Sequence, residues 1–104
     1  MILGWKQEIN AFRTLKGEKS SVKYTIKAEI KGPDRPFMSN ITPIMDNIAA
    51  LEGQDMKNVA GKSSLESVAL YIAEIIKADL DEKDSLNKLR IVEDGIISVE
   101  IQCP

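Results

Sequence analysis

The chain has 104 residues, 43% of them hydrophobic and 29% charged, a composition typical of one soluble globular domain spanning residues 1–104. It contains no histidine and a single cysteine, Cys103, which excludes a histidine-based catalytic pair, a histidine zinc site and an internal disulfide. The net charge of −2 gives no overall attraction to nucleic acid or to acidic membranes. No apolar run approaches the ~20 residues that a membrane span needs, and no signal peptide is expected, so we predict a cytoplasmic protein.

Two strands are expected in the first third of the chain. Residues 2–12 are rich in strand-forming side chains, and residues 21–31 alternate strictly between apolar and polar. A period of two predicts a half-buried antiparallel strand with one apolar and one solvated face. Gly17-Glu18 can form the turn that joins the two strands into a hairpin. The segment 32–36 then ends the second strand, because its prolines lack the ladder donor.

Two helices are expected next. The Thr42-Pro43 start and the apolar spacing that follows predict a short helix that ends near Gly53. A loop is expected over residues 55–62. Ser63, with Glu66 three residues later, has the spacing of a capping box. The apolar stripe from Leu65 to Leu80 then repeats with a period of 3.6 and predicts the strongest helix of the chain.

Two further strands complete the pattern, one over residues 89–93 and one over residues 97–101, joined by an Asp94-Gly95 hairpin turn. The order strand, strand, helix, helix, strand, strand predicts an α+β protein, with a four-stranded antiparallel sheet and both helices on one face. Glu93 falls on the apolar face of its strand, where a carboxylate is costly unless it is paired. The alternative is that this strand ends at Val92 and that Glu93 belongs to the turn.

Five segments in a fixed order carry a family resemblance: residues 23–33, 37–40, 51–59, 63–72 and 89–93. They resemble the 6-pyruvoyl-tetrahydropterin synthase and 6-carboxy-tetrahydropterin synthase family, which adopts the tunnelling fold, or T-fold. The resemblance implies a T-fold subunit that assembles through its strand edges into a barrel-like homo-oligomer. Closure of that kind would also remove exposed sheet edges.

The departures from the family pattern concern its catalytic zinc, which three histidines hold. The resemblance places Ser20, Val22 and Arg13 at those positions, and these side chains cannot replace an imidazole cage. The family's Asp-His relay becomes Asp55-Met56, which keeps the carboxylate and loses the base. The resemblance therefore implies that the zinc-dependent lyase chemistry has been lost, and no metal or other cofactor is expected.

Glu93 matches the family's strand glutamate, which accepts hydrogen bonds from the amino and ring N–H groups of a pterin or purine ring. The leading hypothesis is a pterin-synthase-like protein without zinc chemistry that binds such a ring through Glu93 between subunits. One alternative is a metal-free, aldolase-like enzyme that uses Glu93 with Lys57 or Tyr24. The other is a non-catalytic structural or interaction module whose pocket is filled by side chains. No nucleic-acid or membrane partner is expected.

Overall fold

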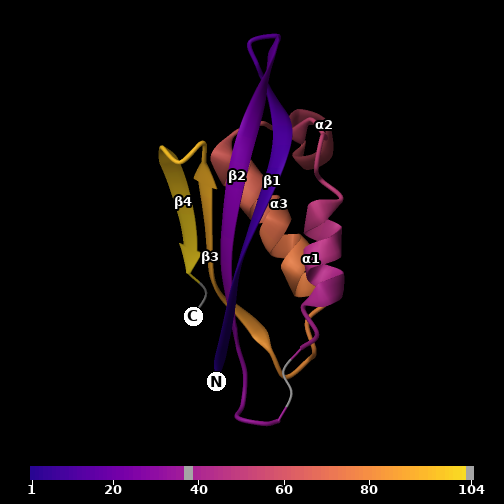
Figure 1. Cartoon of the computed structure of the whole chain (residues 1–104), viewed down its shortest axis with the longest axis vertical. Helices are drawn as coiled ribbons and strands as arrows, with labels where there is room; N and C mark the ends of the chain where they lie inside the picture. The colour runs from indigo at the N-terminus through magenta and orange to yellow at the C-terminus, as the bar shows by residue number, and fades with distance from the viewer. Residues whose placement is uncertain (37–38, 103–104) are drawn as a thin grey trace.

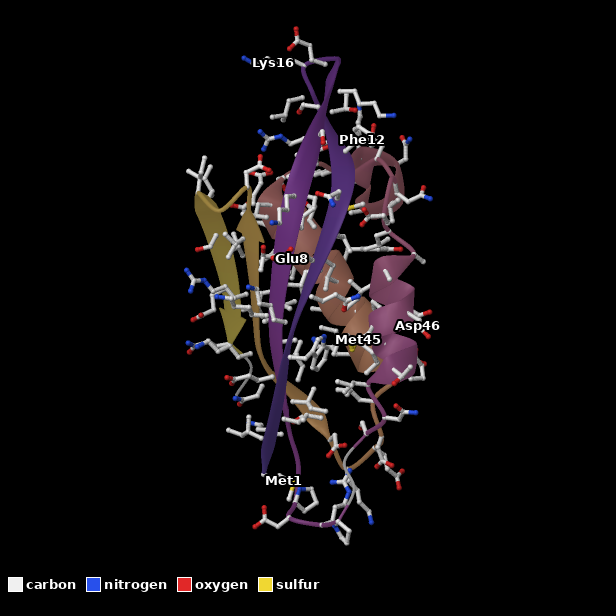
Figure 2. The ribbon with its side chains drawn as sticks, viewed as in Figure 1. Met1, Glu8, Phe12, Lys16, Met45 and Asp46 are labelled. Carbon is white, nitrogen blue, oxygen red and sulfur yellow. The ribbon has the colours of Figure 1, made fainter. Side chains whose placement is uncertain are left out.

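A long β-hairpin forms the first third of the computed structural model, which describes residues 1–36 and 39–102 (Figure 1). β1 (Ile2–Leu15) and β2 (Glu18–Lys31) pair antiparallel over their whole length. Lys16 and Gly17 form the turn with φ values of 51° and 80°, as a tight hairpin with two positive φ angles requires. Lys16 therefore lies at the hairpin tip (Figure 2), and both strands run further than the sequence pattern predicted.

The sheet is completed by β3 (Ser85–Glu93) and β4 (Ile97–Gln102), in the order β1-β2-β3-β4. Every neighbouring pair is antiparallel, which confirms the predicted α+β class and the four-stranded antiparallel sheet. Asp94 and Gly95 adopt φ values of 52° and 72° in the predicted turn. β3 begins four residues before the predicted strand, because Ser85 and Leu86 pair with the end of β2.

The described residues form three helices where two were predicted: α1 (Thr42–Ala49), α2 (Met56–Ala60) and α3 (Leu65–Ala78). The additional helix, α2, lies in the segment expected to be a loop, and its five residues are too few for a periodic pattern to show. Both ends of α2 nevertheless have the usual capping residues of a helix. Asp55 accepts a hydrogen bond from the N–H of Lys57 at the start, and Gly61 ends the helix with a φ of 82°.

The predicted capping box of α3 was wrong by one residue. The N-cap is Ser64, whose hydroxyl accepts from the N–H of Ser67 at 3.3 Å. The hydroxyl of Ser63 instead accepts from the N–H of Thr14 at 3.1 Å and so connects the start of α3 to β1. A contact between residues so far apart in sequence overrides the local spacing that indicated the box.

The helices cover one face of the sheet and leave the other face open (Figure 1). The covered face and the inward sides of α1 and α3 form one apolar core, in which each fully buried aliphatic side chain contributes about 1.5–3 kcal/mol. The largest aliphatic members are Ile9, Val22, Ile26, Ile30, Ile44, Ile48, Ile72, Ile76, Leu89 and Ile91. Among the described residues, no helix is long and apolar enough to cross a bilayer.

A buried ion pair fixes the connection between β2 and α1. Both terminal guanidinium nitrogens of Arg35, Nη1 and Nη2, donate to the Asp84 carboxylate, at 2.9 and 2.7 Å. The N–H and hydroxyl of Ser39 donate to it as well. The bonds from Arg35 and then from Ser39 hold the pKa of Asp84 well below its usual range. Residues 37–38, within the segment 37–40 of the family resemblance, lie outside the described residues, as does Cys103.

Candidate functional site

Glu93 is the last residue of β3, and its carboxylate lies on the helix-covered face of the sheet. It follows Leu89 and Ile91 with a period of two, and only 6% of the residue is exposed. Arg13, near the end of β1, donates from Nη1 to Oε1 of Glu93 at 2.6 Å. Of the two open interpretations, the strand position is therefore correct, and the buried carboxylate has the partner that its burial requires.

Tyr24 lies beside this ion pair, because it is the register partner of Glu93 on β2. The residue is 0% exposed, and its hydroxyl has no hydrogen-bond partner among the described residues. Burial raises the pKa of Tyr24 to about 12, and the nearby Glu93 carboxylate adds to this increase.

Two further polar atoms of the cluster are unused within the described part of the chain. Nε of Arg13 is buried without an acceptor. Oε2 of Glu93 accepts no hydrogen bond from the described residues, and this oxygen is still reached by solvent. Buried polar atoms without partners are rare in native proteins, and each calls for an explanation. The cluster of Arg13, Tyr24 and Glu93 thus retains both donor and acceptor capacity, which a polar ligand would satisfy.

Asp55 lies at the junction of β1 and α2 and forms two hydrogen bonds. Its Oδ2 accepts from the Thr14 hydroxyl at 2.6 Å, and its Oδ1 accepts from the N–H of Lys57 at 3.0 Å. The Thr14 bond, followed by the Lys57 bond, lowers the pKa of the Asp55 carboxyl. Asp55 therefore caps α2 and fixes it to β1, and its role as the remaining half of a proton relay stays a prediction.

The three positions that the sequence resemblance aligns with the family's zinc ligands lie close together in the sheet. Arg13 and Ser20 are register partners, and Val22 follows two residues later on the same face of β2. Val22 is buried in the core and Arg13 is bonded to Glu93, so the group offers one hydroxyl and a cation. These side chains do not fit a zinc ion. Within residues 1–36 and 39–102, no three His, Cys, Asp or Glu side chains are grouped so that they could hold a metal.

Sequence reasoning identified Glu93 but missed Arg13 as its partner. The period of two on β1 places Arg13 on the same inward face as Ile9 and Ala11, and this pattern could have identified it. A lone arginine on an apolar face requires a buried acceptor. Lys57, the other catalytic candidate, is exposed on α2, and no described contact joins it to Glu93.

This chain matches solved structures, whereas it matches no family model and no curated protein by sequence. The solved structure of Caenorhabditis elegans 6-pyruvoyl tetrahydropterin synthase is similar, with a TM-score of 0.81 and 14% sequence identity. The match covers 100% of this chain and 96% of that one. The chain has the T-fold of this synthase. At this identity the likeness establishes the fold alone. Within the sheet, Tyr24 of β2 lies beside the end of β3, and β1, which carries Arg13, lies one strand further away.

Proposed function

We propose that this T-fold protein is a pterin-synthase-like protein without zinc-dependent lyase chemistry, which binds a pterin or purine-like ring through Glu93. The observation that carries the proposal is the unused hydrogen-bonding capacity around this buried carboxylate. Oε2 of Glu93 is an acceptor, whereas the Tyr24 hydroxyl and Nε of Arg13 are donors, and neither donor has a partner among the described residues.

The edge of a pterin or guanine ring has the complementary pattern. It presents an amino group and a ring N–H as donors next to a carbonyl oxygen as an acceptor. A carboxylate binds the two donors well, and a guanidinium or phenol supports the carbonyl. The absence of zinc ligands at Arg13, Ser20 and Val22 favours binding over the lyase reaction.

The proposal includes a homo-oligomer that forms through the strand edges. β1 and β4 are the edge strands of the sheet. The second half of β1 is covered, because Gly53 donates to the carbonyl of Asn10 and Phe12 donates to that of Gln54, both at 2.8 Å. The first half of β1 has no such cover among the described contacts. This stretch and the six residues of β4 are similar in length, which suits edge-to-edge pairing of two copies.

Calorimetric titration with neopterin and guanine tests the ring-binding proposal. We expect saturable binding with one ring per subunit. Glu93→Gln removes a charge-assisted bond worth about 1.5–3 kcal/mol and should weaken binding by roughly 10- to 100-fold. Glu66→Gln, on the exposed surface of α3, is the matched control and should bind as the wild type does. Circular dichroism checks that each variant is folded. Ring binding that Glu93→Gln leaves unchanged would overturn the proposal.

A second candidate, a non-catalytic structural or interaction module, is favoured by one observation. The Glu93 side chain, which is paired with Arg13, is only 7% exposed, and it lines none of the three hollows described for residues 1–36 and 39–102. In such a module the ion pair would act only as a core element. The same titration separates the two functions, because the module binds neither ring, and size-exclusion chromatography with light scattering would still show an assembled protein.

A further inference from the structure

A row of like charges crosses the open face of the sheet, on the side opposite Glu93. Lys6 on β1 is the register partner of Lys27 on β2, and Lys27 is the register partner of Arg90 on β3. Their sequence neighbours face the core, so these three side chains point away from the helices. Neighbouring strands lie about 4.8 Å apart. Like charges directly opposite one another destabilise a sheet, so this basic row, Lys6–Lys27–Arg90, is costly on its own.

Nearby carboxylates relieve this cost only in part. Nζ of Lys6 lies 3.9 Å from a carboxylate oxygen of Glu8, midway along β1 (Figure 2). Nζ of Lys23 lies 3.4 Å from the other oxygen of the same carboxylate. Within the described part of the chain Lys27 forms no ion pair, and the one side-chain hydrogen bond of Arg90 goes to the Ser98 hydroxyl, at 3.5 Å.

The carboxylate that continues the row on β4 is Glu100, the register partner of Arg90. Its oxygens are taken by Lys88 at 3.5 Å and by the side-chain amide of Gln102 at 2.8 Å. In the described residues, neither Lys27 nor Arg90 therefore has a carboxylate within ion-pair distance, although Glu100 lies on the strand beside Arg90.

A hollow of about 360 Å³ lies over the basic row. Its charged lining consists of Lys6, Lys27, Lys88, Arg90, Glu29 and Glu100. Gly4, on the same face of β1, adds no side chain and so leaves room. Ligand pockets typically begin at about 300 Å³. Cations outnumber carboxylates here by four to two, although the whole chain carries a net charge of −2.

We infer that this hollow is a second binding site, distinct from Glu93, which takes a small phosphorylated ligand through the basic row. A phosphate group would supply the missing negative charge, with Arg90 donating in a planar fork and the lysines acting as point charges. The row crosses three strands and is only about 10 Å long. A compact phosphate or polyphosphate group fits this length better than a long nucleic acid, which would also meet the negative charge on the rest of the molecule.

Titration of pyrophosphate and tripolyphosphate into the full chain, at constant ionic strength, tests this inference. Lys27→Gln is the test variant, and Lys16→Gln, at the hairpin tip (Figure 2), is a control with the same change in net charge. We expect the wild type to bind tripolyphosphate saturably, Lys27→Gln to weaken this binding at least tenfold, and Lys16→Gln to change it less than twofold. Without ligand, Lys27→Gln should melt at a higher temperature than the wild type, because it relieves the repulsion within the row.

Three results would overturn the inference. The first is no saturable binding of either anion, and the second is an equal loss of binding in the two lysine variants, which indicates general charge attraction. The third is tighter binding of a single-stranded oligonucleotide than of tripolyphosphate, which assigns the face to nucleic acid. Glu93→Gln should leave tripolyphosphate binding unchanged, so failure of this site and failure of the ring site are distinguishable.

Discussion

Replacing Tyr24 with phenylalanine should stabilise the protein, although it removes a polar group from the centre of the candidate site. The Tyr24 hydroxyl is fully buried and has no hydrogen-bond partner among the described residues. A buried hydroxyl without a partner costs about 1–3 kcal/mol, and phenylalanine keeps the ring that packs in the core. Tyr24→Phe should therefore raise the free energy of unfolding by about 1 kcal/mol. In a domain of this size, that change raises Tm by roughly 4–8 °C.

Urea unfolding, followed by the fluorescence of the single tryptophan, Trp5, measures this change, and circular dichroism gives Tm. Tyr71→Phe on α3 is the matched control and should stay within about 0.5 kcal/mol of the wild type, because the Tyr71 hydroxyl is not a buried orphan. Tyr24→Phe should also weaken ring binding, so stability and binding should change in opposite directions. If Tyr24→Phe instead destabilises the protein by about 1 kcal/mol or more, the Tyr24 hydroxyl is hydrogen-bonded in the folded protein and is not an unpartnered group.

Four other perturbations have defined outcomes. Because the pKa of Tyr24 is raised to about 12, its neutral form favours the folded state, and this stability is lost as pH rises from about 10 to about 12, at ~1.4 kcal/mol per pH unit. Alkaline urea titrations should show this slope in the wild type and its absence in Tyr24→Phe. Asp84→Ala leaves Arg35 without its partner and should cost about 3–5 kcal/mol in urea unfolding at pH 7. The lowered pKa of Asp84 means that its stabilisation is present above about pH 4 and is lost as pH falls further, so acid titration of Asp84→Asn should lack that component. Gly32→Ala would place a Cβ against the Asp84 carboxylate, which Arg35 and Ser39 hold in place, and should lower stability by about 1–3 kcal/mol; an unchanged Tm would show that this contact can yield.

Local patterns were sufficient for most of the fold. Strict alternation in β2, the Asp94-Gly95 turn and the apolar stripe of α3 each predicted the element that forms. They were less reliable where distant parts of the chain meet. The N-cap of α3 is Ser64 and not the predicted Ser63, because the Ser63 hydroxyl is hydrogen-bonded to β1. The unpredicted helix α2 is capped by Asp55, which also accepts a hydrogen bond from Thr14 of β1.

The site was predictable only as far as its strand position. A period of two placed Glu93 on the inward face, which the structure confirms. Its pairing with Arg13 depends on the register of three strands, since Arg13 lies on β1 and Glu93 on β3. The basic row has the same origin, because Lys6, Lys27 and Arg90 are far apart in sequence and only the register sets them side by side. No single-strand pattern contains that information.

The most direct test of the ring-binding proposal is the ¹³C NMR signal of the Glu93 carboxylate during titration with guanine or neopterin. The protein is labelled at the glutamate side-chain carboxyl carbon, and the Glu93 resonance is assigned by its absence in Glu93→Gln. We expect this resonance to shift with added ring and to saturate at one ring per subunit, while the resonances of exposed glutamates such as Glu66 stay in place. A Glu93 resonance that does not move as the ring concentration reaches its solubility limit would rule out ring binding at Glu93 and leave this residue as the partner of Arg13 alone.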